Sequence, residues 1–377
     1  MTSSADPPED LSTWECHAGD VAFAITAPSQ WLSEQREYLS GFLTTPPGEL
    51  DLGTFTIQIH SDDTAFRQIV STITRSSVTR HIEPVLGLVM LESVQPARRC
   101  YVIATDGVEH QAGAYAATAQ GRHIGLFTHS GTTRTHRYPI RLIREAMLRT
   151  YEDTGGVVFH AAGVDVGGVG VMVCGPRGAG KTTTTASLLR STGAALLSND
   201  RLIAHQGNHL VAVPLPVPTA RGTIEAFGEL EHSARRATPE TAELGRMPAD
   251  FGSTVKHAFT ARQFAQAFHT DLISASVLRL VVVPQLTDTR EPARVRHLSP
   301  DEAHQVIAEN CFTPRDEFWV RPWLIPRQRD DDLLHRQANA AIQHVTAAVP
   351  CVEVSFGVRN PITDLVHALD EVIGGIR

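Results

Sequence analysis

Lysine is nearly missing from this chain. Of its 33 lysine and arginine residues only Lys181 and Lys256 are lysines, and 41 acidic residues leave a formal net charge of -8. A surface that binds nucleic acid needs clustered positive charge to neutralise phosphates. The charge balance therefore argues against a nucleic-acid partner.

Metal-binding, disulfide and membrane patterns are also missing. The five cysteines include no Cys-x-x-Cys pair and the eighteen histidines no His-Glu-x-x-His motif, so neither a disulfide framework nor a zinc site is predicted. No apolar run approaches the roughly 20 residues that span a bilayer. The first ten residues are acidic, whereas a secretion signal is basic and then apolar. We therefore expect reduced core thiols and a cytoplasmic protein without a membrane partner.

Length and composition predict a globular protein of more than one domain. With 377 residues, 42% of them hydrophobic, the chain can bury a sizeable core. Residues 1–135 are predicted to form an N-terminal α+β domain, in which we find no catalytic motif. Its expected strands are 21–26, 54–60, 85–91 and 100–105, and its expected helices are 29–44 and 64–74.

Residues 136–377 are predicted to form a second, α/β domain. A helix at 140–151 leads into two apolar runs, 157–166 and 169–174, joined by the turn former Gly167-Gly168. The region 219–260 is predicted to include a loop and a helix that act as a lid. The other expected strands are 195–198, 202–205, 210–213, 277–283 and 351–356, and the other expected helices are 183–190, 300–309, 331–348 and 361–373.

A phosphate-binding motif stands between the second apolar run and the next expected helix, and it fits the P-loop (Walker A) pattern G-x-x-x-x-G-K-[ST]. Its residues are Gly175, Pro176, Arg177, Gly178, Ala179, Gly180, Lys181 and Thr182. In such a loop backbone N–H groups point at a polyphosphate, and the lysine reaches the β and γ phosphates. With Thr182 as a Mg²⁺ ligand and Thr183 beside it, the motif predicts binding of ATP or GTP with Mg²⁺.

Phosphoryl transfer also needs a group that orients the incoming hydroxyl and takes its proton. Asp200 is the best candidate, because it ends the first strand after the P-loop helix; it could instead hold the metal through water or cap a turn. His160 is a candidate for proton transfer, although a lone histidine in an apolar strand is usually a core residue. Arg201, Arg221 and Lys256 are candidate phosphate or substrate contacts, with an ordinary exposed lysine as the alternative for Lys256.

The order of these residues resembles the core of the HPr kinase/phosphorylase family and of its relatives in biosynthetic clusters. The similar stretches are 160–164, the hairpin, 175–183 and 198–201, and the resemblance covers residues 157–213, with a weaker part reaching 283. It implies a P-loop domain with a mixed sheet, similar to that of phosphoenolpyruvate carboxykinase. It also implies His160 as the active-site histidine, Lys181 and Thr182 as nucleotide and Mg²⁺ ligands, and Asp200 as the base.

Two departures from that family bear on the substrate. Asn199 stands where the family usually has a first acid, and the downstream Gly-rich signature linked to the HPr protein is missing. We therefore expect a kinase that transfers the γ-phosphoryl group of ATP or GTP to a hydroxyl of a small metabolite. A peptide or protein serine is the first alternative acceptor, and an NTPase switch that phosphorylates nothing is the second. The resemblance also suggests a homo-oligomer.

Overall fold

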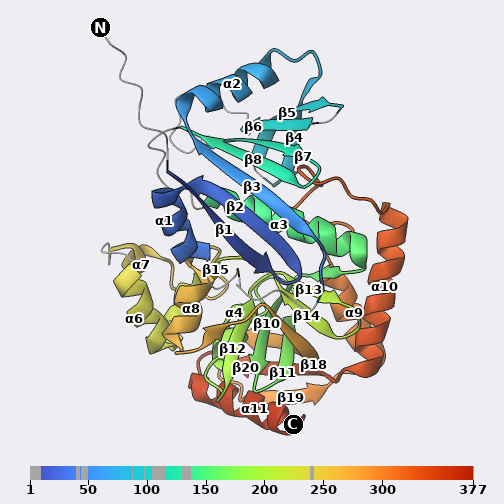
Figure 1. Ribbon diagram of the computed structural model, residues 1–377. Coiled ribbons are helices and arrows are strands. Elements are labelled where there is room, and N and C mark those ends of the chain that lie inside the picture. The colour runs from blue at the N-terminus through green and yellow to red at the C-terminus, as the bar shows by residue number, and fades with distance from the viewer. Residues whose placement is uncertain are drawn as a thin grey trace. The chain divides into compact units, whose positions relative to one another are not determined.

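The computed structural model is a mixed α/β protein with two large mixed sheets, of eight and ten strands (Figure 1). The structure describes residues 10–39, 43, 50–86, 88–96, 98–103, 115–129, 137–237 and 242–376. The chain divides into two compact units. Unit 1 consists of Met1–Thr150 and Arg315–Gln328, and unit 2 consists of Tyr151–Pro314 and Arg329–Arg377.

Unit 1 is built on the eight-stranded sheet, in the order β1-β2-β3-β8-β7-β6-β5-β4. The strand β3 pairs in parallel with β2 and β8, and the other neighbours are antiparallel. The strands are β1 (Leu11–Ala18), β2 (Val21–Pro28), β3 (Thr54–Ser61), β4 (Thr79–Val85), β5 (Leu88–Gln95), β6 (Arg98–Ile103), β7 (Tyr115–Gln120) and β8 (His123–Thr128). The helices that begin in this part of the chain are α1 (Ser29–Leu39), α2 (Asp63–Thr74) and α3 (Arg137–Thr154).

The helix α2 packs on this sheet because it carries an apolar stripe. The buried residues recur at helical spacing and contact β6, β7 and β8. They are Phe66, Ile69, Val70 and Ile73. The carboxylate of Asp62 caps the helix by accepting the backbone N–H groups of Thr64 and Ala65.

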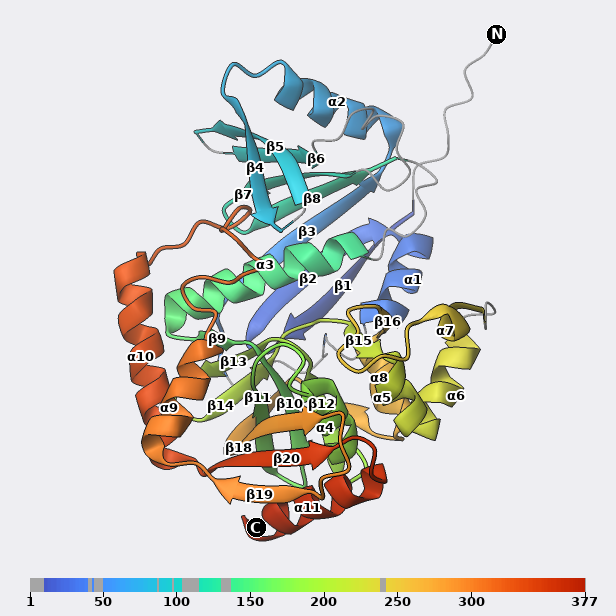
Figure 2. The ribbon, with the colours of Figure 1, turned by 180° about the vertical axis from the view of Figure 1, so that it is seen from behind.

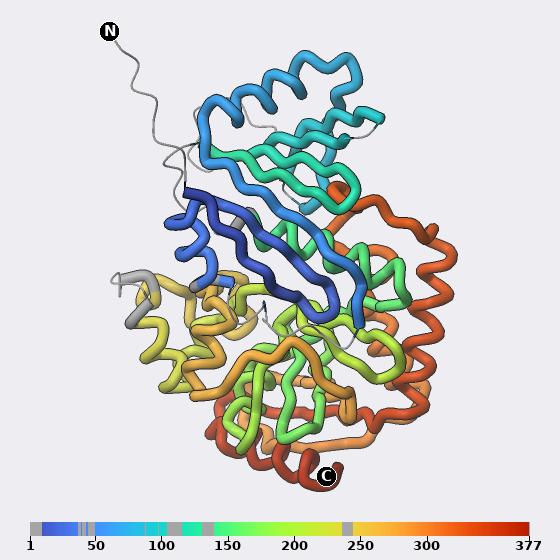
Figure 3. The backbone as a smooth tube through the Cα atoms, in the orientation of Figure 1, coloured from blue at the N-terminus to red at the C-terminus, as the bar shows by residue number. Residues whose placement is uncertain are grey.

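A segment from far along the chain, Arg315–Gln328, completes unit 1; in Figure 3 it is the orange stretch of backbone that precedes the last long helices. The ring of Trp323 is fully buried and meets Tyr101 edge-on, with 5.2 Å between ring centroids. The backbone N–H of Trp323 donates to the Glu145 carboxylate at 2.9 Å, and the backbone carbonyl of Trp323 accepts from the Tyr101 hydroxyl. Unit 1 is therefore discontinuous in sequence.

Unit 2 contains the ten-stranded sheet, in the order β17-β12-β10-β11-β18-β14-β13-β9, with β20 pairing both β18 and β19. Its strands are β9 (Val157–Phe159), β10 (Ala161–Val166), β11 (Val169–Cys174), β12 (Ala194–Ser198), β13 (Leu202–His205), β14 (His209–Ala212), β17 (Asp271–Leu272), β18 (Ala275–Thr287), β19 (Arg294–His297) and β20 (Cys351–Gly357). A separate antiparallel ribbon is formed by β15 (Val217–Ala220) and β16 (Lys256–Phe259). The helices are α4 (Lys181–Leu188), α5 (Arg221–Ala226), α6 (Gly228–Ala237), α7 (Ala242–Arg246), α8 (Ala261–Ala267), α9 (Pro300–Glu309), α10 (Asp331–Ala348) and α11 (Ile362–Gly374).

The long strand β18 gives this sheet its mixed character. The strand β14 pairs antiparallel with its start, whereas β11 and β20 pair in parallel with its later residues. On one face α9 and α10 lie side by side (Figure 2), and their Ile307 and Ile342 share a core with Met172 and Val281. Because successive side chains of a strand point to opposite faces, Val173 and Val282 face the other side. There, α4 contacts both α11 and β11.

Several predicted elements of unit 2 are confirmed. The strand 169–174 and the helices 300–309 and 331–348 lie as predicted, and Gly167-Gly168 forms the turn of the β10–β11 hairpin. The predicted helix 183–190 is wrong in its bounds, because α4 begins two residues earlier. The apolar run 157–166 is two strands, since β9 pairs with β13 whereas β10 pairs with β11 and β12.

In the N-terminal part, the predicted strands 21–26 and 54–60 and the predicted helix 64–74 are confirmed as parts of β2, β3 and α2. The expected strand 85–91 is wrong, because β4 ends at Val85 and β5 begins at Leu88. The boundary near residue 135 and the stretches 40–42, 44 and 104–105 of the expected elements lie outside the described residues, as do residues 238–241 of the predicted lid. Within the described ranges, no helix combines the length and the apolar composition of a membrane span.

Candidate functional site

The predicted phosphate loop connects the buried strand β11 to α4. Gly180, the residue before α4, has a φ of 107°, and Gly178 has a φ of 88°. Glycine adopts this left-handed conformation without steric cost. The first N–H groups of a helix have no partner within it, so the start of α4 offers them to an anion.

Lys181 folds back over this loop. Its Nζ donates to the carbonyl of Gly175 at 2.6 Å and to that of Pro176 at 3.3 Å. These bonds hold the ammonium group at the loop, where the β and γ phosphates of a P-loop nucleotide lie. The positive charge of Lys181 also acts on Asp200, which it helps to keep ionised.

Oxygen atoms suited to a magnesium ion lie at the start of α4. Oγ1 of Thr182 lies 3.5 Å from Oδ1 of Asn199, while Thr183 hydrogen bonds with Thr223 of α5 at 2.9 Å. Proteins usually bind Mg²⁺ through one or two carboxylates together with substrate phosphates. Thr182, Asn199 and Asp200 fit such a shared site. Across the described residues, no group of three His, Cys, Asp or Glu side chains could hold a metal by itself.

His160 stands between the end of β9 and the start of β10, and its side chain lies against Asp200. The backbone N–H of His160 donates to the carbonyl of Asn310 at 2.8 Å, in place of a strand neighbour. Nε2 of His160 lies 3.2 Å from Oδ1 of Asp200, and Nη1 of Arg201 lies 2.7 Å from Oδ2. Each carboxylate oxygen thus has a nitrogen partner, while 33% of the Asp200 side chain stays exposed.

Hydrogen bonding and charge keep Asp200 ionised. Burial, the largest single influence, raises its pKa, but the hydrogen bond from His160 and the charges of Arg201, His160 and Lys181 together bring the pKa below its usual value. The φ of Asp200 is 81°, which is uncommon for a residue other than glycine. Such backbone strain persists only where surrounding contacts determine the conformation, and it concentrates at functional sites.

Phe312, on which this group packs, is a site residue that no sequence pattern indicated. Its ring stacks on that of His160, with 4.9 Å between centroids and 15° between planes, and Cζ of Arg201 lies 4.9 Å from the Phe312 centroid. The residue follows α9 without any motif, and about 150 residues separate it from His160 in sequence. Only the folded chain brings them together.

Lys256 belongs to the same neighbourhood. It begins β16 and pairs in register with Ala220 of β15. Its side chain is exposed, yet desolvation by nearby protein atoms and the charge of Arg177 lower its pKa, while the charge of Asp200 raises it. Both lysines of the chain therefore lie within electrostatic reach of Asp200.

Arg221 is placed differently. Its Nε donates to the Glu225 carboxylate at 2.7 Å and its Nη1 to the carbonyl of Met247 at 2.9 Å. The guanidinium is thus bound within the segment that was predicted to form a lid. Among the described residues, no hydrogen bond or ion pair joins it to Asp200 or to the phosphate loop.

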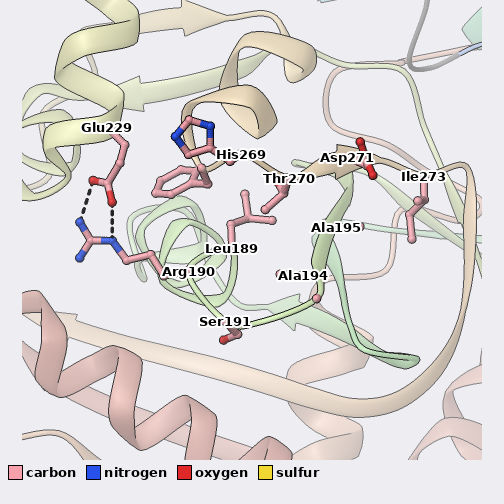
Figure 4. Close-up of a pocket in the computed structure, with 12 residues that line it drawn as sticks. Leu189, Arg190, Ser191, Ala194, Ala195, Glu229, His269, Thr270, Asp271 and Ile273 are labelled. Carbon is pink, nitrogen blue, oxygen red and sulfur yellow. Dashed lines mark hydrogen bonds and ion pairs between the residues drawn. The ribbon is translucent and has the colours of Figure 1, made fainter.

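A cavity of about 550 Å³ lies at the other end of α4 (Figure 4). Arg190 and Glu229 face each other there through two hydrogen bonds, of 3.0 and 2.7 Å. The guanidinium of Arg190 also lies over the ring of Phe227, at 4.7 Å from its centroid. None of the predicted site residues lines this cavity, and its main charged pair is already satisfied. The phosphate loop therefore remains the candidate site.

The structure thus brings the phosphate loop, Asn199, Asp200, His160 and Arg201 into one site, with Lys256 near it. No protein-family model matches this chain, and no curated protein matches it either. The chemistry of the site is therefore the basis on which a function can be assigned.

Proposed function

We propose that this protein is a Mg²⁺-dependent kinase that transfers the γ-phosphoryl group of ATP or GTP to a hydroxyl group of a small metabolite. The observation that supports this best is the environment of Asp200, an ionised and partly exposed carboxylate within electrostatic reach of Lys181. A P-loop alone suits any NTPase. A carboxylate near the P-loop lysine adds a group that can bind the attacking hydroxyl, as phosphoryl transfer requires.

The proposed step conserves atoms and charge. The acceptor oxygen forms a bond to the γ-phosphorus while the bond from that phosphorus to the β–γ bridging oxygen breaks, which releases ADP or GDP. The hydroxyl proton passes to the Asp200 carboxylate and then to solvent. Lys181 stabilises the charge on the phosphate oxygens, and Mg²⁺ bound at Thr182 would neutralise more of it. Because its pKa is lowered, Asp200 is a weak base that mainly orients the hydroxyl.

The resemblance to the HPr kinase/phosphorylase family supports the same proposal. A histidine, a P-loop and an acid follow one another in that family, and the matching residues here are His160, Lys181 and Asp200. A P-loop domain of the phosphoenolpyruvate carboxykinase type is part of this proposal. A small acceptor is favoured over a protein serine because the signature associated with HPr is missing.

Transfer of label from γ-labelled ATP tests the proposal. The protein is incubated with Mg²⁺ and with separate pools of metabolites and peptides, and we expect one small hydroxyl compound to be labelled. The Asp200→Asn substitution keeps the shape of the side chain but removes the charge and the proton acceptor. It should bind nucleotide as wild type does and lose transfer by about 10²- to 10⁴-fold. Lys181→Ala should lose nucleotide binding itself.

Asp288→Asn is the matched control, because Asp288 is an exposed acid of unit 2 that pairs with Arg359. Exposed ion pairs contribute little to stability, so this variant should transfer label like wild type. If ATP is hydrolysed without labelling any compound, and the Asp200→Asn variant hydrolyses it equally fast, the kinase proposal is contradicted. An NTPase switch would then be favoured. Label in a peptide serine would replace the small metabolite by the first alternative acceptor.

A further inference from the structure

The backbone around Phe312 is fixed against the strand that leads to His160. The N–H of Phe312 donates to the carbonyl of Val158 at 2.8 Å, and the N–H of Val158 donates to Oγ1 of Thr313 at 3.0 Å. The N–H of His160 donates to the carbonyl of Asn310. Residues 310–313 therefore lie along β9, where Phe159 and Cys311 form an isolated antiparallel bridge, and these bonds limit where the Phe312 ring can lie.

Phe312, His160, Arg201 and Asp200 form a closed arrangement of four side chains. Phe312 contacts His160 by stacking and Arg201 by a cation–π contact, and both of these residues bond to Asp200, one at each carboxylate oxygen. Only 8% of Phe312 is exposed, so the ring is itself held in place. Arginine has several flexible torsions and histidine two, and a fixed aromatic face restricts both.

Asp200 needs such support more than an ordinary aspartate does. Its backbone is in the left-handed conformation, and part of its side chain faces solvent. A carboxylate that orients a hydroxyl must keep one direction, because small displacements of a reacting group reduce the rate strongly. The two bonds from His160 and Arg201 supply that direction only while these two side chains stay in place.

We infer that Phe312 is a positioning residue of the site, which holds His160 and Arg201 against Asp200 so that the carboxylate stays aligned with the γ-phosphate. This inference rests on the proposed phosphoryl transfer. Phe312 itself does not touch the reacting atoms. It acts through the two residues that its ring orients.

Loss of the Phe312 ring should affect turnover rather than nucleotide binding. The ring contacts His160 and Arg201, and neither residue belongs to the phosphate loop. Without the aromatic face both side chains can turn away from Asp200, so the carboxylate loses its direction while the phosphate loop is unchanged.

Phe312→Met tests this, because methionine keeps an apolar side chain of similar bulk without an aromatic face. The assay follows release of labelled orthophosphate from γ-labelled Mg-ATP, with water as the acceptor. We expect kcat to fall about tenfold and KM for Mg-ATP to stay within about twofold. Phe312→Tyr keeps the ring and should restore the rate.

Phe268→Met is the matched control, since Phe268 is similarly buried, at 9% exposed, and packs on Phe227 and Phe264. It should keep the wild-type kcat and KM. A Phe312→Met variant with the wild-type kcat would overturn the positioning role, and so would a tyrosine variant that fails like methionine while still folded by circular dichroism. If Asp200→Asn turns over ATP as fast as wild type, the proposed role of Asp200 itself is wrong. If Phe312→Met is as fast as wild type but Asp200→Asn is slow, only the positioning role is wrong and the kinase proposal stands.

Discussion

The proposed magnesium site at the phosphate loop includes the neutral amide of Asn199. The residue is only 6% exposed, and its Oδ1 is the atom that faces the hydroxyl of Thr182. A neutral amide oxygen binds Mg²⁺ more weakly than a carboxylate, because ligand charge contributes to affinity. We therefore expect Asn199→Asp to lower the Mg²⁺ concentration for half-maximal binding of a fluorescent ATP analogue several-fold.

A second substitution separates metal binding from a change of shape. Asn199→Ala removes the oxygen without adding charge, so it should raise the Mg²⁺ requirement while binding of the metal-free nucleotide changes little. Titrations of both variants with MgCl₂ give the comparison. The same requirement in wild type and both variants would place Asn199 outside the metal site.

For two buried cysteines we predict how the rate of alkylation depends on pH. Burial raises the pKa of the Cys174 thiol to about 12 and that of Cys351 to about 11. Because the thiolate is the reactive form, alkylation of the native protein by iodoacetamide should be slow at pH 8 and accelerate towards pH 11. In urea the pKa returns to about 8.5 and labelling should be fast. Mass spectrometry of each peptide measures this, and rapid native labelling at pH 8 would contradict the burial.

At the scale of elements, the start of α4 depends on a glycine. An alanine at position 180 would have to keep the left-handed φ, which costs about 1–2 kcal/mol, and its Cβ would come within 2.6 Å of the Leu286 side chain. We expect Gly180→Ala to lower the free energy of unfolding by about that amount and to weaken nucleotide binding. Urea titration and binding of the fluorescent ATP analogue measure the two effects.

Gly222→Ala provides the comparison for this element. A Cβ at Gly222 meets nothing within 4 Å, and the residue lies in the first turn of α5. Alanine favours helix over glycine by about 1 kcal/mol, so this variant should be as stable as wild type or more stable. If both glycine variants unfold alike, the left-handed turn is not what α4 requires.

Elements with strong local signals could be predicted from sequence. Ser299 and Glu302 form a capping box that starts α9, and the apolar run of β11 is long and uninterrupted. The strand β7 was missed because its sequence, Tyr115–Gln120, is rich in alanine, which has a low strand propensity, and pairing with β6 and β8 decides its conformation.

In the candidate site, too, residues with local sequence signals could be predicted and a residue placed by distant contacts could not. The phosphate loop and Asp200 could be found because local motifs and strand order indicate them. Phe312 could not, because its contacts with His160 and Arg201 depend on the pairing of residues 310–313 with β9. No local pattern contains that information, since the partners are far apart in sequence.

At the scale of the whole molecule, unit 1 combines the N-terminal part of the chain with a segment from far along the sequence. Its segment Arg315–Gln328 lies between α9 and α10 of unit 2 in sequence, and Trp323 binds Tyr101 and Glu145. A fragment of residues 151–377 retains this segment without those partners. We therefore expect its tryptophans to be exposed to water and to emit at longer wavelength than in the full chain.

A full-length variant makes this comparison specific. The chain has four tryptophans, and Trp14→Phe with Trp31→Phe leaves only Trp319 and Trp323, the same two that the fragment carries. In the full chain they are 5% and 0% exposed, so the double variant should emit at short wavelength and resist quenching by acrylamide. The fragment should emit near the unfolded value and be quenched readily. Equal spectra would mean that residues 151–377 alone bury Trp319 and Trp323. The assignment of Arg315–Gln328 to unit 1 would then be wrong.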